Sequence, residues 1–219
     1  MRALVIGASG GIGQAFARAL EGRGDDVVCV SRKENALDLR DPKSVEDVLG
    51  DLDGGFQMVL VATGILAAEG HAPEKSLSAI EHQAMQDVFA VNAVGTALIL
   101  KHLPRLLGKE GRGVAGVLTA RVGSIGDNQM GGWHSYRASK AAANMLVRGA
   151  AIELSRTHKD SIVVALHPGT VETPFTASYP SHRKMDAEES AGKLLAVLDA
   201  LTPAETGRFF DYTGSEVVW

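Results

Sequence analysis

The stretch Arg2-Ala3-Leu4-Val5-Ile6-Gly7-Ala8-Ser9-Gly10-Gly11-Ile12-Gly13 decides the fold of this chain. Residues 2–6 form an apolar run that is too short for a helix and ends in strand-forming side chains. The glycines follow at once, and residues 11–22 then carry apolar side chains at helical spacing. A strand, a glycine-rich turn and a helix in this order are typical of a loop that binds the phosphates of a nucleotide.

Residues 7–13, which we call the glycine loop, have the chemistry that such binding needs. Glycine lets the main chain turn tightly and approach a pyrophosphate closely. The N–H groups and the dipole at the start of the following helix then stabilise negative charge. The alternative is a tight turn without a ligand, which the strand before it and the helix after it disfavour. The candidate cofactor-binding residues here are Gly7, Ser9, Gly11, Ile12 and Gly13.

A second predicted strand, residues 26–31, ends in Ser31 and Arg32. In dinucleotide-binding folds an acidic residue about 20 residues beyond the glycines usually binds the ribose 2′-hydroxyl of NAD. Here an arginine stands at that distance, and arginine binds phosphate through two parallel, charge-assisted hydrogen bonds. Ser31 and Arg32 therefore predict that NADP(H) is preferred over NAD(H), unless this segment is simply a solvated charged loop.

Predicted strands and helices alternate along the chain, which favours an α/β fold with a doubly wound parallel sheet. We expect one Rossmann-type domain over residues 1–219, in agreement with a length that can bury one core. The expected strands lie near 2–6, 26–31, 36–38, 57–62, 113–119, 161–167 and 207–210. The expected helices lie near 11–22, 42–50, 76–107, 133–157 and 185–200.

Tyr136 and Lys140 stand four residues apart, and Ser124 lies twelve residues before the tyrosine. A spacing of four places a phenol and an ammonium on one helix face. At about 4 Å and an effective dielectric near 20 their attraction is about 4 kcal/mol, enough to lower the tyrosine pKa by at most about three units. The pattern thus predicts Tyr136 as a general acid or base near neutral pH. Ser124 would hydrogen-bond the same substrate oxygen.

Together, the glycine loop, Ser124, Tyr136 and Lys140 resemble the short-chain dehydrogenases/reductases, and the similarity extends over nearly the whole chain. The resemblance implies that Lys140 binds the nicotinamide ribose and that Asn92 helps to complete a proton relay through water. It also implies that Asp38 and Leu39 lie at the adenine. Other positions that it matches to cofactor contacts are Gly64, Pro168, Gly169 and Thr173.

The chain departs from the family's pattern after the strand predicted at 57–62. The family's Asn-Asn-Ala-Gly is Val61-Ala62-Thr63-Gly64 here, which keeps the glycine but changes how the central sheet is stabilised. The closing residues 207–212 and Trp219 are similar to the C-factor-like branch of the family.

Composition excludes several other classes of protein. With a net charge of −4 the chain has no basic surface for nucleic acid, and its seven histidines show no metal-binding spacing. No run of about 18 apolar residues predicts a membrane span, so we expect a cytoplasmic protein. Small residues on the predicted helix of Tyr136, with the family resemblance, predict a homodimer or homotetramer.

Two functions remain open at this stage. The first is an NADP-dependent oxidoreductase that transfers hydride between nicotinamide and a small carbonyl or alcohol substrate. Residues 174–190 would form a flap over its substrate, with Met130, Trp133 and Phe175 lining the pocket. The second is an NADP-binding signalling or sensor protein with little turnover, which the presence of Ser124, Asn92, Tyr136 and Lys140 disfavours because a sensor needs no tuned phenol.

Overall fold

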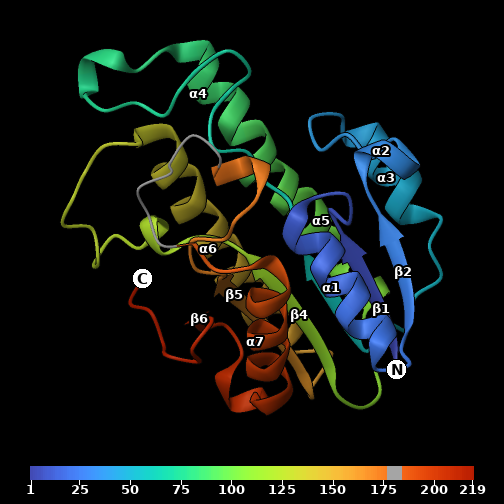
Figure 1. Ribbon diagram of the computed structural model, residues 1–219. Helices are drawn as coiled ribbons and strands as arrows, with labels where there is room; N and C mark the ends of the chain where they lie inside the picture. Colours follow the sequence, from blue (N-terminus) through green and yellow to red (C-terminus); the bar gives the residue numbers. More distant parts are fainter. Residues whose placement is uncertain (177–183) are drawn as a thin grey trace.

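The computed structural model describes residues 1–176 and 184–219, and one parallel six-stranded sheet runs through this part of the chain (Figure 1). Its strand order is β2-β1-β3-β4-β5-β6, and every neighbouring pair is parallel. This arrangement confirms the predicted Rossmann-type fold. The strands are β1 (Arg2–Ile6), β2 (Asp26–Val30), β3 (Met58–Val61), β4 (Gly113–Leu118), β5 (Ser161–His167) and β6 (Phe209–Asp211).

Helices cover both faces of the sheet. The helices α1 (Gly11–Gly22) and α7 (Ala187–Ala200) lie side by side on one face (Figure 1). The opposite face packs against α3 (Pro42–Gly50), α5 (Gly95–Leu106) and α6 (His134–Leu154). The shorter elements include α2 (Arg32–Asn35), α4 (His82–Phe89), a π-helical turn at Ala90–Val94 and 3-10 turns at Leu77–Ala79, Arg121–Gly123, Pro174–Thr176 and Pro203–Glu205.

Strand β1 shows how the sequence produces the two layers. Side chains of a strand alternate between the faces of a sheet. Ala3 and Val5 accordingly join the core under α1 and α7, whereas Leu4 and Ile6 join the core under α3, α5 and α6. All four are buried. A strand that is apolar on both faces is what a central parallel strand requires.

Three predicted elements differ from the structure. No strand forms at 36–38, because Ser31 caps the short helix α2 and Ala36 ends it in the left-handed region at φ 57°. The helix expected over 76–107 is divided into a 3-10 turn, α4, the π-helical turn and α5. The last strand begins at Phe209 rather than residue 207, where Gly207 has a φ of 77° that a strand does not adopt.

Because all six strands are parallel, their carboxyl ends meet at one edge of the sheet. The segments that follow β1, β3, β4 and β5 therefore lie along this edge, and they include Gly7, Gly64, Ser124 and Pro168. In open α/β sheets, ligands bind beyond these ends. The fold thus brings the candidate residues of distant segments to one side of the molecule.

Candidate active site

At Gly7 and Gly13 the glycine loop is packed so closely that a side chain would not fit. A Cβ atom on Gly13 would lie 2.2 Å from the Gly7 carbonyl oxygen, and Gly7 itself has a φ of 90°. The N-cap residue of α1 is Gly10, which has no side chain to cap the helix, and the first turn of α1 holds no acidic residue. The first-turn N–H groups of α1 are thus open to an anion, and the loop fits a pyrophosphate.

The other candidate residues of this loop divide into two kinds. Ser9 is exposed and can reach a ligand. Ile12 is partly buried, and its side chain packs against the core under α1 and α7. Thr173 lies directly over the loop, because a Cβ on Gly11 would be 2.6 Å from its Cγ2. The segment after β5 therefore meets the segment after β1, as a cofactor that touches both would need.

Ser31 and Arg32 lie at the end of β2. Ser31 is buried and its Oγ accepts a hydrogen bond of 3.2 Å from the Glu34 N–H, which caps α2. Arg32 is exposed and makes no hydrogen bond or ion pair with the described residues. Glu34 brings its carboxylate within 3.4 Å of the Ser31 Oγ. An unpaired guanidinium beside a helix start fits a phosphate, with one carboxylate at its border.

Asp38 and Leu39 have structural partners. Both carboxylate oxygens of Asp38 accept hydrogen bonds from Arg40, at 3.0 and 2.9 Å, and these bonds hold the pKa of Asp38 below its usual value. Leu39 is buried, and a Cβ on Gly95 would lie 2.7 Å from its Cβ. Leu39 thus fixes the start of α5 against the segment that follows α2.

Gly64 brings two of the candidate catalytic residues together. A Cβ at Gly64 would lie 3.0 Å from Lys140 Nζ and 3.1 Å from Asn92 Oδ1. The Asn92 amide exchanges two hydrogen bonds of 2.8 Å with the main chain of Ile65 and donates a third, of 3.0 Å, to Ser139 Oγ. The asparagine is therefore fixed in place, and a side chain at Gly64 would be in tight contact with both Asn92 and Lys140.

Tyr136 and Lys140 are both buried on α6, one turn apart, with Lys140 Nζ 6.0 Å from the centroid of the tyrosine ring. Burial raises the pKa of Tyr136 above its ordinary value, which is opposite to the lowering predicted from the sequence. Burial also lowers the pKa of Lys140 to about 8. Burial disfavours the charged form of each group, the phenolate of Tyr136 and the ammonium of Lys140. This effect on the two pKa values is larger than the attraction between the two charges.

Ser124 follows the 3-10 turn at Arg121–Gly123 and is buried. Gly123 presses this turn onto α6, since a Cβ there would lie 2.8 Å from the Lys140 main chain. The Ser124 Oγ accepts a hydrogen bond of 3.0 Å from the Asp127 N–H. With its acceptor side occupied in this way, the hydroxyl keeps its proton available for another oxygen.

Pro168 and Gly169 follow β5. The Pro168 carbonyl accepts a hydrogen bond of 2.8 Å from Ser190 Oγ, and Gly169 adopts a φ of 81°. A Cβ at Gly169 would lie 3.0 Å from the ring of Tyr212. The turn is thus fixed between α7 and the segment after β6.

The predicted flap lies only partly within the described residues. Residues 177–183 fall outside them, and residues 187–190 form the first turn of α7. Beside Tyr136, the ring centroids of Phe175 and Trp133 lie 5.9 and 6.2 Å from that of the tyrosine. Met130, which the sequence placed with them, is 87% exposed. Two aromatic rings therefore border the phenol.

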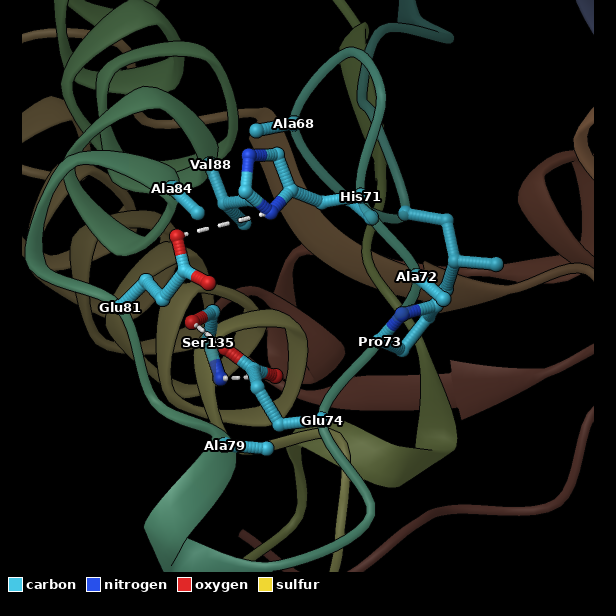
Figure 2. A pocket seen from close by; sticks show the side chains of 12 residues that line it. Ala68, His71, Ala72, Pro73, Glu74, Ala79, Glu81, Ala84, Val88 and Ser135 are labelled. Atoms are coloured by element: carbon cyan, nitrogen blue, oxygen red, sulfur yellow. Dashed lines mark hydrogen bonds and ion pairs between the residues drawn. The ribbon is translucent and has the colours of Figure 1, made fainter.

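The sequence did not single out Glu74 or Ser139. Glu74 accepts hydrogen bonds from the Ser135 hydroxyl and, at 3.2 Å, from the Ser135 N–H, so that it caps α6 one residue before Tyr136. Figure 2 shows this contact in a pocket that His71 and Glu81 also line. Burial alone would raise the pKa of Glu74, but the hydrogen bonds hold it below its usual value. Ser139 stands between Tyr136 and Lys140 in the sequence, so its place beside these residues has a local signal.

Among the described residues, no group of three or more His, Cys, Asp or Glu side chains is arranged to hold a metal ion. Within the same part of the chain, no helix has the length and apolar character to span a membrane.

The glycine loop and the buried Tyr136–Lys140 turn both lie at the carboxyl edge of a parallel sheet, the edge at which dinucleotide-binding α/β folds hold their ligands. The chain belongs to the short-chain dehydrogenase/reductase family, because the family model of short chain dehydrogenases matches residues 1–184. The family predicted from the sequence is thereby confirmed.

Two curated relatives illustrate the range of the family. The chain is 32% identical, over 233 aligned positions, to 1-hydroxy-2-glutathionyl-2-methyl-3-butene dehydrogenase from a Rhodococcus species, with 99% of this chain and 98% of that protein covered. It is 38% identical over 145 positions to the C-signal protein of Myxococcus xanthus, with 66% of this chain and 84% of that protein covered.

Solved structures share the fold. A short-chain dehydrogenase/reductase from Burkholderia multivorans with bound NADP superimposes with a TM-score of 0.82 at 24% identity, covering 100% of this chain and 99% of that one. The NADPH-bound carbonyl reductase from chicken fatty liver also gives 0.82, at 23% identity, with coverages of 100% and 94%.

Proposed function

We propose that this protein is an NADP(H)-dependent oxidoreductase that acts on a carbonyl or alcohol substrate, with Tyr136 as the general acid or base. The observation that carries this proposal is the convergence at Gly64. Lys140 Nζ and Asn92 Oδ1 lie about 3 Å from one point there, and Tyr136 is one helical turn from the lysine. A binding protein without turnover would not need a phenol, an ammonium and a fixed amide together.

The cofactor would lie along the carboxyl edge of the sheet. The open first turn of α1 and Ser9 would hold the pyrophosphate, Thr173 and the Pro168–Gly169 turn would border the nicotinamide, and Lys140 would bind its ribose. Asp38 and Leu39 would lie near the adenine. NADP(H), when bound there, would supply the hydride or accept it.

The tyrosine would exchange a proton with the substrate oxygen. Because burial raises its pKa, Tyr136 is protonated near neutral pH, which suits the donor role in carbonyl reduction. Ser124 would donate a hydrogen bond to the same oxygen. Lys140 would stabilise the phenolate that remains, and its pKa of about 8 allows it to give up a proton in turn. Asn92 would position the water of that relay.

The preference for NADP(H) rests on Arg32. This guanidinium is exposed and without a partner among the described residues, at the end of β2 where the ribose 2′-position is expected. A phosphate there would gain a charge-assisted bidentate contact. Ser31 would add a hydroxyl contact, although it shares that hydroxyl with Glu34.

We further propose that residues 1–219 form a single catalytic domain in which the segment from residue 174 to the start of α7 covers the substrate. The rings of Trp133 and Phe175 beside Tyr136 favour a substrate with an apolar part next to its carbonyl carbon. No nucleic acid or membrane partner is proposed, and the cytoplasm is the proposed location.

A homodimer or homotetramer is also part of the proposal. On α6, Met145 is 71% and Ile152 is 47% exposed, and both stand on the same helix as small alanine side chains. Burying such side chains against a second copy would remove apolar surface from water. Light scattering across a range of concentrations should give a particle of two or four chains, and a strict monomer throughout would contradict it.

The activity can be tested with a panel of ketones, aldehydes and alcohols, followed by the absorbance of NADPH and, in parallel, of NADH. We expect at least one carbonyl compound with an apolar substituent to be reduced with NADPH. Tight binding of NADPH without turnover on any member of the panel would instead support a sensor protein.

A further inference from the structure

The loop that carries Ser124 is tied to the far edge of the sheet by charged side chains. Residues 119–127, which we call the Ser124 loop, follow β4 in the middle of the sheet. Within it, the Arg121 Nε donates to Asp127 Oδ2 at 2.7 Å. The same guanidinium lies 3.5 Å, through its Nη1, from Oδ2 of Asp211 at the end of β6. Arg121 thus bridges two carboxylates that are far apart in the sequence.

The Asp211 carboxylate, which contacts Arg121, is buried and held by hydrogen bonds of its own. The Asp211 side chain is 9% exposed. One carboxylate oxygen accepts hydrogen bonds from the Thr213 N–H at 2.8 Å, the Thr213 hydroxyl at 2.6 Å and the Ser215 N–H at 3.3 Å. The other oxygen faces Arg121. These three hydrogen bonds therefore fix the orientation of the Asp211 carboxylate independently of Arg121.

A second contact joins the same two segments. The Gly126 N–H donates to the Trp219 carbonyl at 2.9 Å, and the Trp219 ring stacks on Phe209 of β6 with 5.7 Å between ring centroids. The Ser124 loop consequently lies against β6 and residues 215–219 on its outer side, and against α6 on its inner side through Gly123.

We propose that Arg121 is a positioning residue that acts through Ser124, an inference that rests on the proposed function. By holding Asp127, Arg121 keeps the Asp127 N–H directed at the Ser124 Oγ. That hydrogen bond occupies an acceptor site of the hydroxyl and leaves its proton to the substrate oxygen. The Arg121–Asp127 pair is largely exposed, and such a pair contributes little to global stability, so we expect its loss to affect this loop and not the whole fold.

The test is a double-mutant cycle with Arg121→Gln and Ser124→Ala on the substrate found by the panel. Removing one hydrogen-bond donor to a reacting oxygen lowers kcat by about 10²–10³. We expect Arg121→Gln to cause only part of this loss, a decrease in kcat of about three- to thirtyfold. KM and the Kd of NADPH should stay within about twofold. In the Ser124→Ala background, the same substitution should change kcat by less than about twofold.

The matched control is Arg208→Gln. Arg208 has similar exposure and pairs with Glu216 at 3.3 Å next to β6, and among the described residues its side chain makes no hydrogen bond or ion pair with the Ser124 loop. It should leave kcat unchanged in both backgrounds, and Arg121→Lys should recover part of the loss. An equal loss from Arg121→Gln with and without Ser124, or no loss in the parent, would overturn the proposal.

A readout without turnover separates this proposal from the proposed function. Hydrogen exchange at the Asp127 amide, measured by NMR, should be at least about fivefold faster in Arg121→Gln than in the parent or in Arg208→Gln, because Asp127 is no longer held with its N–H directed at the Ser124 Oγ. Unchanged exchange would overturn the positioning role even if the enzyme is active. Faster exchange without any turnover on the panel would support the contact and reject only the activity.

Discussion

Two loops at the same edge of the sheet are built in opposite ways. The glycine loop after β1 is made of main chain, and it offers donors that lack side-chain caps. The Ser124 loop after β4 is made of paired side chains, whose partners stand as far away as Asp211. In the glycine loop, the N-cap residue Gly10 has no side chain, so main-chain N–H groups at the start of α1 are left for a ligand. In the Ser124 loop, a hydrogen bond from Asp127 instead orients the hydroxyl that would meet the substrate.

The difference shows which kind of site a local sequence pattern can predict and which kind depends on residues that are distant in the sequence. Space for a phosphate depends on absent side chains within seven residues, so the local pattern is enough to detect it. The orientation of a hydroxyl depends on residues that the fold brings from another strand. Substitutions should therefore separate binding, on the side of the glycine loop, from chemistry, on the side of α6 and the Ser124 loop.

Tyr136→Phe should give the largest effect and test that separation most directly. It removes only the phenol oxygen, so kcat should fall by about 10²–10⁴. The Kd of NADPH should remain within about twofold, because the ring still packs between Trp133 and Phe175. Steady-state kinetics and cofactor titration measure the two quantities. Parent-like turnover would show that another group is the acid.

Lys140 should make stability depend on pH. Its pKa falls from 10.5 in the unfolded chain to about 8, so the unfolded state holds more protons between these values and stability rises with pH. At about 1.4 kcal/mol per pKa unit, the free energy of unfolding should gain about 3 kcal/mol from pH 8 to about pH 11. Urea unfolding of the parent and of Lys140→Met measures the difference. A parallel pH dependence in both would contradict the burial of a charged lysine.

Arg32→Ala should weaken the binding of NADPH and thereby test the cofactor-binding part of the comparison. Loss of a charge-assisted contact costs about 1.5–3 kcal/mol, so the Kd of NADPH should rise about ten- to a hundredfold while that of NADH stays constant. Lys33→Ala is the matched control, since it removes the same charge from the next residue. Equal affinity of the parent for NADPH and NADH would refute the predicted preference.

The smallest effect should separate two glycines of one helix. Gly13→Ala forces a Cβ to within 2.2 Å of the Gly7 oxygen and should cost about 1–3 kcal/mol of stability, together with cofactor affinity. Gly22, at the other end of α1, has no atom within 4 Å of its would-be Cβ. Gly22→Ala should thus gain up to about 1 kcal/mol in urea unfolding. A gain in stability at both sites would mean that helix propensity, and not the space in the loop, is decisive.

Most of the fold could be predicted from local patterns. The strands of the sheet and the helices α1, α3, α6 and α7 follow from apolar runs and periodicity, which act over a few residues. The strand expected at 36–38 fails because the capping of α2 by Ser31 and the left-handed Ala36 turn the chain away. Such a competition between a cap and a short apolar run is not decided by the run itself.

The candidate site was predictable as a set of residues and less so in its electrostatics. The motif located Tyr136 and Lys140 but gave the wrong direction for the tyrosine pKa, because burial depends on the whole core. Glu74 carries no local signal at all, since its role exists only once the segment after β3 reaches the start of α6. Arg121 likewise gains its second partner only when β6 joins the sheet.

The π-helical turn at Ala90–Val94 has a consequence for the length of the chain. Such a turn holds one residue more than an α-helical turn, and one residue corresponds to about 100° of rotation about the axis. Deleting a single codon within 90–94 should therefore convert this turn to a regular α-helical turn and change the direction of the Asn92 side chain, which now bonds Ile65, although no reading frame is lost. A similar deletion in the loop at 65–73 would leave α4 and α5 in register. At this point the gene must conserve a count of amino acids and not only their kinds.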